Sequence, residues 1–336
     1  MKIDKYIEIV TTPIAGLNLM PQSTKNSIFE TLNKHYSKVK LTVIEKESDL
    51  KKLVQNRPDL VFSGIKYVGF NSNSTKRESI EKVWLTDFLD ENNILYTGSS
   101  RKALELEFDK GKAKKLIQDC GIKTAPYFIA QPNQFNRQQI PLEFPLFIKP
   151  LFEGDSRGID AKSLAHNFEE YEQKVASIFQ TLKTASLVEK YLSGKEYTVG
   201  LLQNFIDDTY QILPVEIIPQ KDINGDRFLG FDDKVADKEL VFKITDEKIK
   251  RAVSNLAEKS FQALGAKGFG RIDIKIDNHG VPHFLEANLI PGLGTGYFYR
   301  CYHINTGLSH ENLILEITRK TLKLSANAVP AKSSLY

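Results

Sequence analysis

The chain has 336 residues, of which 41% are hydrophobic and 26% are charged, with 46 basic and 42 acidic side chains. This length indicates two or three domains, and the net charge of +4 gives no support for a nucleic-acid or membrane partner. The two cysteines lie far apart in the sequence, which excludes a disulfide framework and a cysteine-based zinc site as working hypotheses. Without a signal-peptide pattern or an apolar run of about 18 residues, we expect a cytoplasmic protein.

The first domain is predicted over residues 1–98, where short apolar runs alternate with helical patterns. The predicted strands are Tyr6–Val10, Lys40–Glu45, Asp59–Phe62 and Ile94–Tyr96, and the predicted helices cover 22–36, 47–56 and 77–91. This alternation predicts a parallel sheet covered by helices, which would bind ligands at the carboxyl ends of its strands.

Two further domains are predicted over 99–188 and 189–325, followed by a tail at 326–336. The second domain has predicted helices at 101–119 and 167–182, with a strand at Pro145–Pro150 between them. The third begins with a strand–turn–strand pattern over 186–204 and continues with an amphipathic helix at Asp246–Leu264, a hairpin within 268–296 and a helix near 309–323. The fold class is therefore α/β and α+β.

The hairpin carries the clearest chemical signal. Because side chains alternate between the two faces of a strand, one face carries Arg271, Asp273, Lys275 and Asp277. On the return strand, Glu286 and Asn288 also share a face. If the two polar faces coincide, Asp273, Glu286 and Asn288 form an oxygen cluster that suits Mg²⁺ bound together with substrate phosphates. That cluster predicts an ATP site, and a solvated hairpin face is the alternative.

Two other segments fit a nucleotide site. Lys149 ends an apolar strand and precedes a loop with two glycines, where backbone N–H groups could converge on phosphate, although a plain surface turn explains the loop equally well. Neither the P-loop nor the GxGxxG pattern occurs. In Ala185–Val199, an apolar strand runs into a polar link with two glutamates, which could serve a purine and a ribose; an ordinary hairpin is the alternative.

Four motifs together resemble the ATP-grasp fold of the D-alanine–D-alanine ligase family in order and spacing. They are Phe147–Pro150 with Glu153-Gly154, Val188–Val199, Gly268–Asp273, and Leu285–Asn288 with Pro291-Gly292. The resemblance covers residues 95–325 well and the first domain in outline. It implies three domains with ATP between the last two.

The resemblance also implies roles for individual residues. The nucleotide phosphates would be contacted by Lys110, Lys149 and the loop residues Glu153 and Gly154, and adenine and ribose by Glu189, Lys190, Leu192 and Glu196. Two Mg²⁺ ions, with Mn²⁺ as the alternative metal, would be bound by Asp273, Glu286 and Asn288. Catalytic roles would fall to Arg271, Lys234, Gly292 and Ser156.

The implied reaction is physically coherent. ATP would convert a carboxylate to an acylphosphate, which an amine then attacks, with Arg271 and backbone N–H groups near Gly292 stabilising the oxyanion. Because water would hydrolyse the acylphosphate, a closing lid is expected, and 153–158 and 222–237 are the candidates.

Departures from the family pattern gather where the family binds amino acids. The stretch Phe62–Asn71 lacks the family's histidine and acidic pair, and no acid occurs around Thr11–Ser23. The glycine loop has Asp155 and Arg157 where the family has serine and valine, and Val235 stands where the family has a tyrosine. After Gly292, a serine–leucine pair is replaced by the run Leu293–Tyr299, which includes Thr295. We take Arg157, Asp155 and Thr295 as candidate substrate contacts, Arg157 because guanidinium binds carboxylate in a fork; an exposed lid residue is the alternative for Arg157.

Three hypotheses for the function follow. The first is a carboxylate–amine ligase that joins amino-acid substrates other than D-alanine to D-alanine. The second is a D-alanine–D-alanine ligase of cell-wall synthesis, and the third is a nucleotide-binding protein on this fold without catalysis. The expected partners are small molecules, and because relatives on this fold are often dimers, a homodimer is a further expectation.

Overall fold

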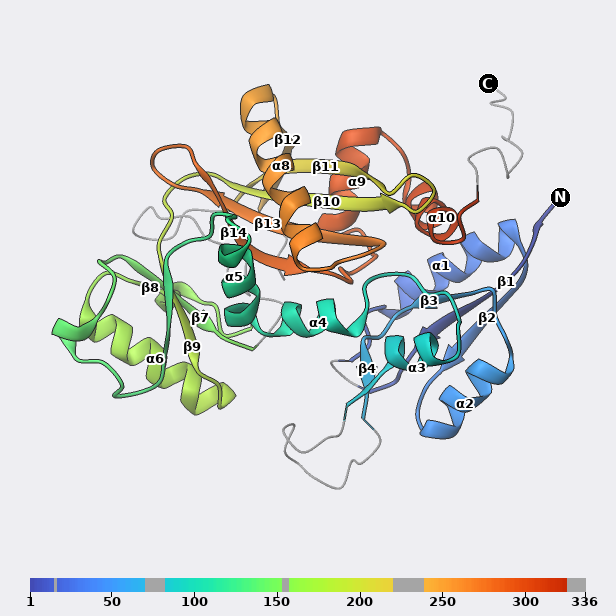
Figure 1. Cartoon of the computed structure of the whole chain (residues 1–336), viewed down its shortest axis with the longest axis horizontal. Helices are drawn as coiled ribbons and strands as arrows, with labels where there is room; N and C mark the ends of the chain where they lie inside the picture. Colours follow the sequence, from blue (N-terminus) through green and yellow to red (C-terminus); the bar gives the residue numbers. More distant parts are fainter. Residues whose placement is uncertain (15–16, 70–81, 153–156, 220–238, 325–336) are drawn as a thin grey trace.

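The computed structural model of the chain describes residues 1–14, 17–69, 82–152, 157–219 and 239–324. Three bodies of secondary structure follow one another: an N-terminal parallel sheet, a four-stranded antiparallel sheet and a five-stranded antiparallel sheet (Figure 1). Helices α4 and α5 run between the first body and the other two (Figure 1). The domain boundaries at 98 and 188 stay a prediction; strand β9 continues to Lys190, two residues beyond the second of them.

The N-terminal body is a parallel sheet in the order β2-β1-β3, with helices on its two faces. Its elements are β1 (Ile3–Thr11), α1 (Gln22–His35), β2 (Tyr36–Val43), α2 (Glu47–Gln55), β3 (Leu60–Ser63), the pair β4 (Tyr67–Val68) and β5 (Val83–Trp84), and α3 (Leu85–Glu91). Alternating apolar residues of β1 explain the two layers: Ile7 and Ile9 pack toward α1, and Val10 packs with the buried leucines of α2 and α3.

The four-stranded sheet has the order β6-β9-β7-β8 and is covered by α6. It is reached through α4 (Arg101–Phe108) and α5 (Lys110–Asp119) and comprises β6 (Tyr127–Ala130), β7 (Leu146–Pro150), β8 (Leu164–Ala165), α6 (Phe168–Leu182) and β9 (Ser186–Lys190), with short 3₁₀ helices at Arg137–Gln139 and Ala161–Ser163. Tyr171, Val175 and Ile178 recur at helical spacing and bury one face of α6 against the sheet.

The five-stranded sheet has the order β12-β11-β10-β13-β14. Its elements are β10 (Glu196–Asn204), β11 (Thr209–Ile218), β12 (Leu240–Lys243), α8 (Glu247–Ala263), β13 (Phe269–Ile276), β14 (Pro282–Asn288), α9 (Tyr297–Thr306) and α10 (His310–Thr321). Two glycines let helices approach it: a Cβ on Gly270 would lie 2.7 Å from Phe261 of α8, and one on Gly200 would lie 3.0 Å from Cys301 of α9. Gly200 pairs with Arg271 and so shares its face of the sheet, whereas Gly270, the neighbour of Arg271 on β13, faces the other way. Helices α8 and α9 therefore cover opposite faces of the sheet.

Several sequence predictions need correction. Ile94–Tyr96 is no strand, because only an isolated parallel bridge joins Tyr96 to Val61. The predicted helix at 77–91 begins only at Leu85, since Val83–Trp84 is extended and 77–81 lies outside the described residues. The predicted helix at 101–119 is broken at Asp109, whose side chain accepts the N–H of Lys112 and begins a new helix.

The strand–turn–strand pattern over 186–204 is not a hairpin. β9 pairs with β6 and β7 in one sheet, and β10 pairs with β11 and β13 in another. The link 191–195 therefore crosses from sheet to sheet. A Cβ on Gly194 would lie 2.4 Å from the carbonyl oxygen of Ile276, so only glycine lets this link approach β13. Helix α9 falls in a stretch where the sequence predicted no element.

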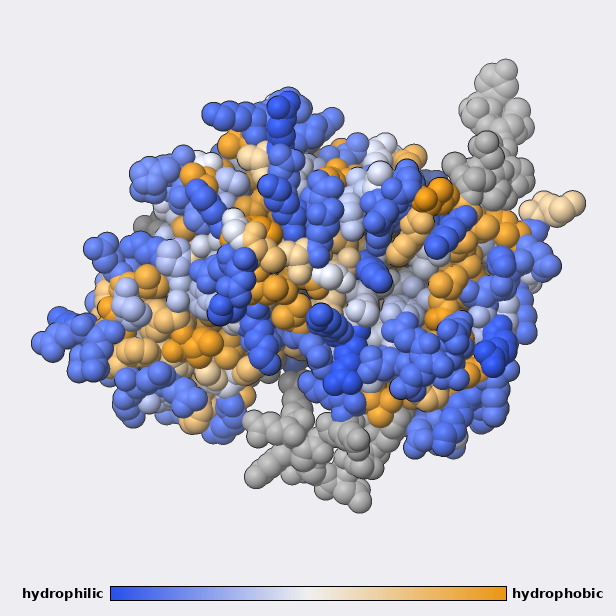
Figure 2. All heavy atoms as spheres, viewed as in Figure 1, coloured by the Kyte–Doolittle hydropathy of each residue, from blue (hydrophilic) through white to orange (hydrophobic). Residues whose placement is uncertain are grey.

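The surface agrees with the ordinary composition. On the face shown in Figure 2, hydrophilic residues cover most of the area, and hydrophobic residues are scattered between them. Among the described residues, none of the helices combines the length and apolar content that a membrane crossing needs.

Candidate active site

The two polar faces of the β13–β14 hairpin coincide, as predicted. Arg271 is opposite Asn288 and Asp273 is opposite Glu286 in the strand register. Arg271 and Asp273 form a two-pronged ion pair, with Nε to Oδ1 at 2.9 Å and Nη2 to Oδ2 at 3.0 Å. The alternative of a solvated hairpin face is excluded, because all of β13 is buried and Arg271 and Asp273 are each 9% exposed as whole residues.

The Asp273 carboxylate is held from several sides. Thr198 of β10 donates its hydroxyl to Oδ1 at 2.6 Å, and Asn288 donates its amide to Oδ2 at 3.2 Å. Thr198 and Asp273 are register partners on neighbouring strands, so the sheet itself brings the hydroxyl to the acid. Asp273 is therefore fixed in position by β10, β13 and β14 together.

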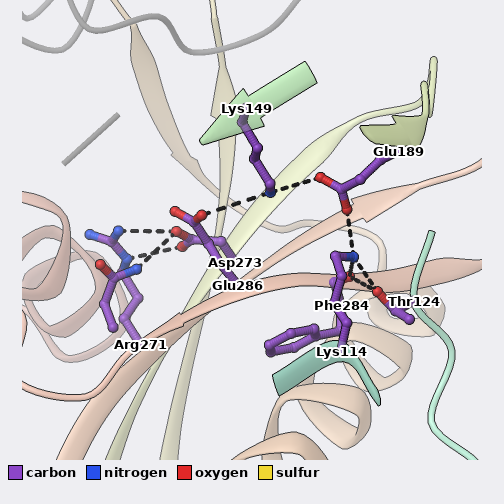
Figure 3. Close-up of polar contacts among 9 residues, drawn as sticks. Lys114, Thr124, Lys149, Glu189, Arg271, Asp273, Phe284 and Glu286 are labelled. Carbon is purple, nitrogen blue, oxygen red and sulfur yellow. Dashed lines mark hydrogen bonds and ion pairs between the residues drawn. The ribbon is translucent and has the colours of Figure 1, made fainter. Parts of the chain in front are cut away.

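Lys149 links this hairpin to the four-stranded sheet (Figure 3). Its Nζ lies 2.8 Å from Glu189 Oε2 and 3.8 Å from Glu286 Oε2. On the other side of Glu189, Lys114 Nζ lies 2.5 Å from Oε1 and donates to Thr124. Buried charges of alternating sign thus run from α5 through β9 and β7 to β14.

These neighbouring charges shift one another's pKa values. Burial would lower the pKa of Lys149, but Glu189 and Glu286 outweigh it and raise that pKa. Burial would likewise raise the pKa of Glu189, but Lys114 and Lys149 hold it below its ordinary value. Burial lowers the pKa of Lys114 in spite of Glu189. Lys149 is therefore a charged ammonium at neutral pH, which suits a contact with phosphate.

A cleft of about 750 Å³, open to solvent, lies between the two antiparallel sheets. Its polar wall includes Lys149, Glu189, Lys190, Glu196, Arg271, Asp273, Lys275 and Glu286. Its apolar wall includes Ala125, Phe147, Ile159, Leu192, Ile217 and Leu285. An apolar slot with a few convergent charges is the form of a nucleotide-sized binding site.

The structure brings together most, but not all, of the predicted site residues that lie within its described ranges. Lys110 is buried at the start of α5, and Asn288 reaches the cluster through Asp273; neither lines the cleft. Gly292, Thr295 and Arg157 do not line it either, Gly292 and Thr295 being exposed just before α9. Glu153, Gly154, Asp155, Ser156 and Lys234 lie outside the described residues, as does the candidate lid 222–237.

Sequence reasoning missed Lys114 and Thr198, which hold the two key acids. Lys114 stands four residues after Lys110 on the same helix face, so the spacing of lysines in α5 was the available signal. Thr198 follows Glu196 at the spacing of one strand face, which was a second signal. Tyr297, whose ring centre lies 5.0 Å from the Arg271 guanidinium carbon, also lines the cleft.

The donor set is chemically suited to Mg²⁺. Among the described residues, no three acidic, histidine or cysteine side chains gather as a metal-binding group. Two facing carboxylates, Asp273 and Glu286, with the amide of Asn288 beside them, nevertheless match an ion that takes one or two protein carboxylates and completes its shell with water and phosphate. In the structure, Asp273 is occupied by Arg271, Thr198 and Asn288 instead.

Comparison with known proteins agrees with this site. A family model described as the D-ala D-ala ligase C-terminus matches residues 116–319. The chain is 30% identical over 238 residues to a D-alanine–D-alanine ligase of Laribacter hongkongensis, covering 68% of this chain and 71% of that protein. It is 28% identical over 246 residues to one of Aquifex aeolicus, covering 72% and 75%.

Among solved structures, the chain is similar to a D-alanine–D-alanine ligase from Bacillus anthracis complexed with ATP. The TM-score is 0.71 at 18% identity, covering 95% of this chain and 98% of that one, which confirms the predicted fold class. An ATP-grasp ligase is thus the class that fold and cleft define. The chain belongs to the D-alanine–D-alanine ligase family.

Proposed function

We propose that the protein joins a carboxylate to an amine through an acylphosphate, using ATP and amino-acid substrates other than D-alanine at both positions. The observation that supports the reaction most directly is the convergence, in one cleft, of Lys149, the Asp273–Glu286 pair and Arg271. The apolar slot beside Leu192 would hold adenine, which places the phosphates toward Lys149 and the reacting carboxylate toward Arg271.

The chain's own residues have separable tasks in this reaction. Lys149 would neutralise the transferring phosphoryl group, and Arg271 would stabilise the oxyanion that forms when the amine attacks. Mg²⁺, bound by Asp273, Glu286 and Asn288, would offset the charge of the phosphates. Thr198 would keep Asp273 in place when Arg271 turns toward the substrate.

The Glu189 carboxylate has a different task from the one that the family resemblance implied. Both of its oxygens are taken by lysines, at 2.5 and 2.8 Å, so it would orient Lys149 rather than frame adenine through its side chain. Leu192 and the apolar wall would then carry the contact with the base.

The proposal of unusual substrates depends on the end of the cleft near Arg271 and Tyr297, called the acceptor end because the attacking amine would bind there. The residue run that replaces the family's serine–leucine pair ends in the first turn of α9, which begins at Tyr297, and the Tyr297 side chain lines the cleft. A tyrosine ring beside Arg271 occupies space that a serine would leave open, which favours an acceptor of different shape.

The test is ADP release with ATP and Mg²⁺ against a panel of D- and L-amino acids, singly and in pairs, with product masses measured alongside. Release that requires one particular pair, together with the mass of its condensation product, would establish the reaction and its substrates. A best rate with D-alanine alone would contradict the substrate proposal and leave the second function.

That second function is a D-alanine–D-alanine ligase. It is favoured by the relatives that are 28% to 30% identical, which carry that name. The same panel separates the two functions, because only the second predicts that D-alanine suffices at both positions.

A further inference from the structure

Lys275 and Glu196 form a buried ion pair in the wall of the cleft. They are register partners on β13 and β10, and Lys275 Nζ lies 3.2 Å from Glu196 Oε2. The two side chains are only 7% and 12% exposed, and both line the cleft. The ammonium also lies 5.6 Å from the ring centre of Tyr191, in the link between the two sheets.

The position of Lys275 on β13 shows which part of a bound nucleotide it would face. Arg271, Asp273 and Lys275 point to the same side of the strand, and two residues span about 7 Å. Arg271 and Lys275 therefore lie on opposite sides of Asp273. If Asp273 serves the phosphates and Arg271 the reacting carboxylate, Lys275 lies at the nucleoside end, beside Tyr191 and Leu192.

An ammonium at that end needs a reason, since adenine and ribose carry no charge. A buried lysine is costly unless a carboxylate pairs with it. Its partner is Glu196, the residue expected to accept hydrogen bonds from the ribose hydroxyls. With Oε2 held by Lys275, the carboxylate can present Oε1 in one orientation, and its negative charge no longer repels the polyphosphate.

We propose that Lys275 is a positioning residue that fixes Glu196 for the ribose and thereby makes the site select ribonucleotides over deoxyribonucleotides. This inference rests on the proposed function, since it requires ATP to bind in the cleft. A hydrogen bond to a charged group is strong enough to make the preference about tenfold or more.

The experiment compares dissociation constants for ATP, 2′-deoxy-ATP and 3′-deoxy-ATP in the full-length wild type and in Lys275→Met. The wild type should bind ATP at least about tenfold more tightly than one of the deoxy analogues, and the variant should lose most of that preference. Lys275→Arg keeps the charge and should restore part of it. Thermal midpoints report whether each variant folds, and Lys275→Gln replaces Lys275→Met if the latter does not.

Lys195→Met is the matched control. Lys195 neighbours Glu196 but pairs with Glu216 at 2.8 Å, with 65% of its own side chain exposed. Its removal should leave all three constants and their ratios unchanged. Glu196→Gln should abolish the preference, and adding Lys275→Met to it should change the ratio no further, because the lysine acts through the glutamate.

Two results would overturn the inference. One is an unchanged ribose preference in a folded Lys275 variant, with all three nucleotides weakened equally, which would make the pair merely structural. The other is a wild type that binds ATP and the deoxy analogues alike. Failure of the proposed function looks different: the wild type would bind no ATP, or would release no ADP with any substrate pair.

Discussion

Lys149 and Glu189 form a buried ion pair in the wall of the cleft. The lysine comes from β7 and the glutamate from the neighbouring strand β9, and their charged atoms lie 2.8 Å apart with both side chains nearly fully buried. Glu189 also binds Lys114, so one carboxylate compensates two buried ammonium groups. The same glutamate therefore serves folding and the orientation of Lys149.

We expect Glu189→Gln to destabilise the protein strongly. The substitution leaves Lys114 and Lys149 buried without a shared counterion, and breaking a buried ion pair costs about 3–5 kcal/mol. The thermal midpoint should fall, and the KM for ATP should rise because Lys149 loses its orientation. Glu169→Gln is the control, since its ion pair with Arg137 is exposed and contributes at most about 1 kcal/mol.

A double variant tests the charge argument itself. Adding Lys114→Met to Glu189→Gln removes one of the two uncompensated charges, so it should recover part of the lost stability. Burial penalises the charged form of Lys114, which is why the pKa of Lys114 is lowered. The methionine carries no charge, so the double variant should regain stability even though no hydrogen bond is restored. Additive losses in the double variant would show that the two residues do not interact.

Arg271 variants separate a ligase from a nucleotide-binding protein without catalysis. In a ligase, Arg271→Met should abolish product formation and keep ATP affinity. In a binding protein without catalysis, no oxyanion forms, so the same substitution should leave the activity unchanged. The ion pair with Asp273 complicates this variant, because the buried acid loses its partner. Arg271→Lys keeps the positive charge beside Asp273 but cannot form two parallel hydrogen bonds as the guanidinium does. The variant should therefore retain stability and still lower the turnover by about 10²-fold or more.

Thr198→Val should weaken the metal site more than the fold. The hydroxyl donates to Asp273 at 2.6 Å, and a bond to a charged group contributes about 1.5–3 kcal/mol. We expect the Mg²⁺ concentration for half-maximal ADP release to rise about tenfold or more in this variant. In the wild type, Mn²⁺ should be able to replace Mg²⁺, and EDTA should abolish turnover. Thr209→Val, which removes a similar bond to Asp207 in an exposed turn, should leave the metal dependence unchanged. Equal effects of the two variants would contradict a role for Thr198.

Structural features that follow from a regular spacing of polar and apolar residues were predicted correctly from the sequence. The alternation along β13 and β14 placed Arg271 with Asp273, and Glu286 with Asn288, on shared faces. The two faces meet because the register shifts by one residue between Asp273 and Ile274, and the sequence pattern did not predict that irregularity. The amphipathic spacing of α8 located that helix within a residue of its ends. Both signals are local, because the chain itself carries the partner or the periodic face.

Features that depend on distant contacts were not readable. Nothing local distinguishes a hairpin from the link 191–195, which sends β9 and β10 into different sheets. Likewise, α5 offers several lysines, and only the tertiary placement of Glu189 selects Lys114 as the buried one. α9 was missed because Gly294 and Gly296 obscure its beginning, and the helix is stabilised by packing on β10 and β11.

The two cysteines should differ sharply in reactivity. Cys301 is buried in α9, and burial raises the pKa of its thiol to about 12 although the nearby Arg271 opposes the shift. At pH 8 only about 10⁻⁴ of that thiol would be ionised, and the thiolate is the form that iodoacetamide alkylates. Cys120, at the exposed end of α5, should therefore be alkylated first in the folded protein.

Peptide mass spectrometry after timed alkylation measures this difference. In Cys120→Ser protein, the remaining thiol should react slowly at pH 8 and its rate should rise roughly tenfold per pH unit up to pH 10, because each unit raises the thiolate fraction tenfold while the pKa stays near 12. Guanidinium chloride should abolish the protection. Since Cys301 packs against Gly200, one strand from Arg271, rapid alkylation of the folded protein would mean that α9 separates from β10 and opens the acceptor end of the cleft.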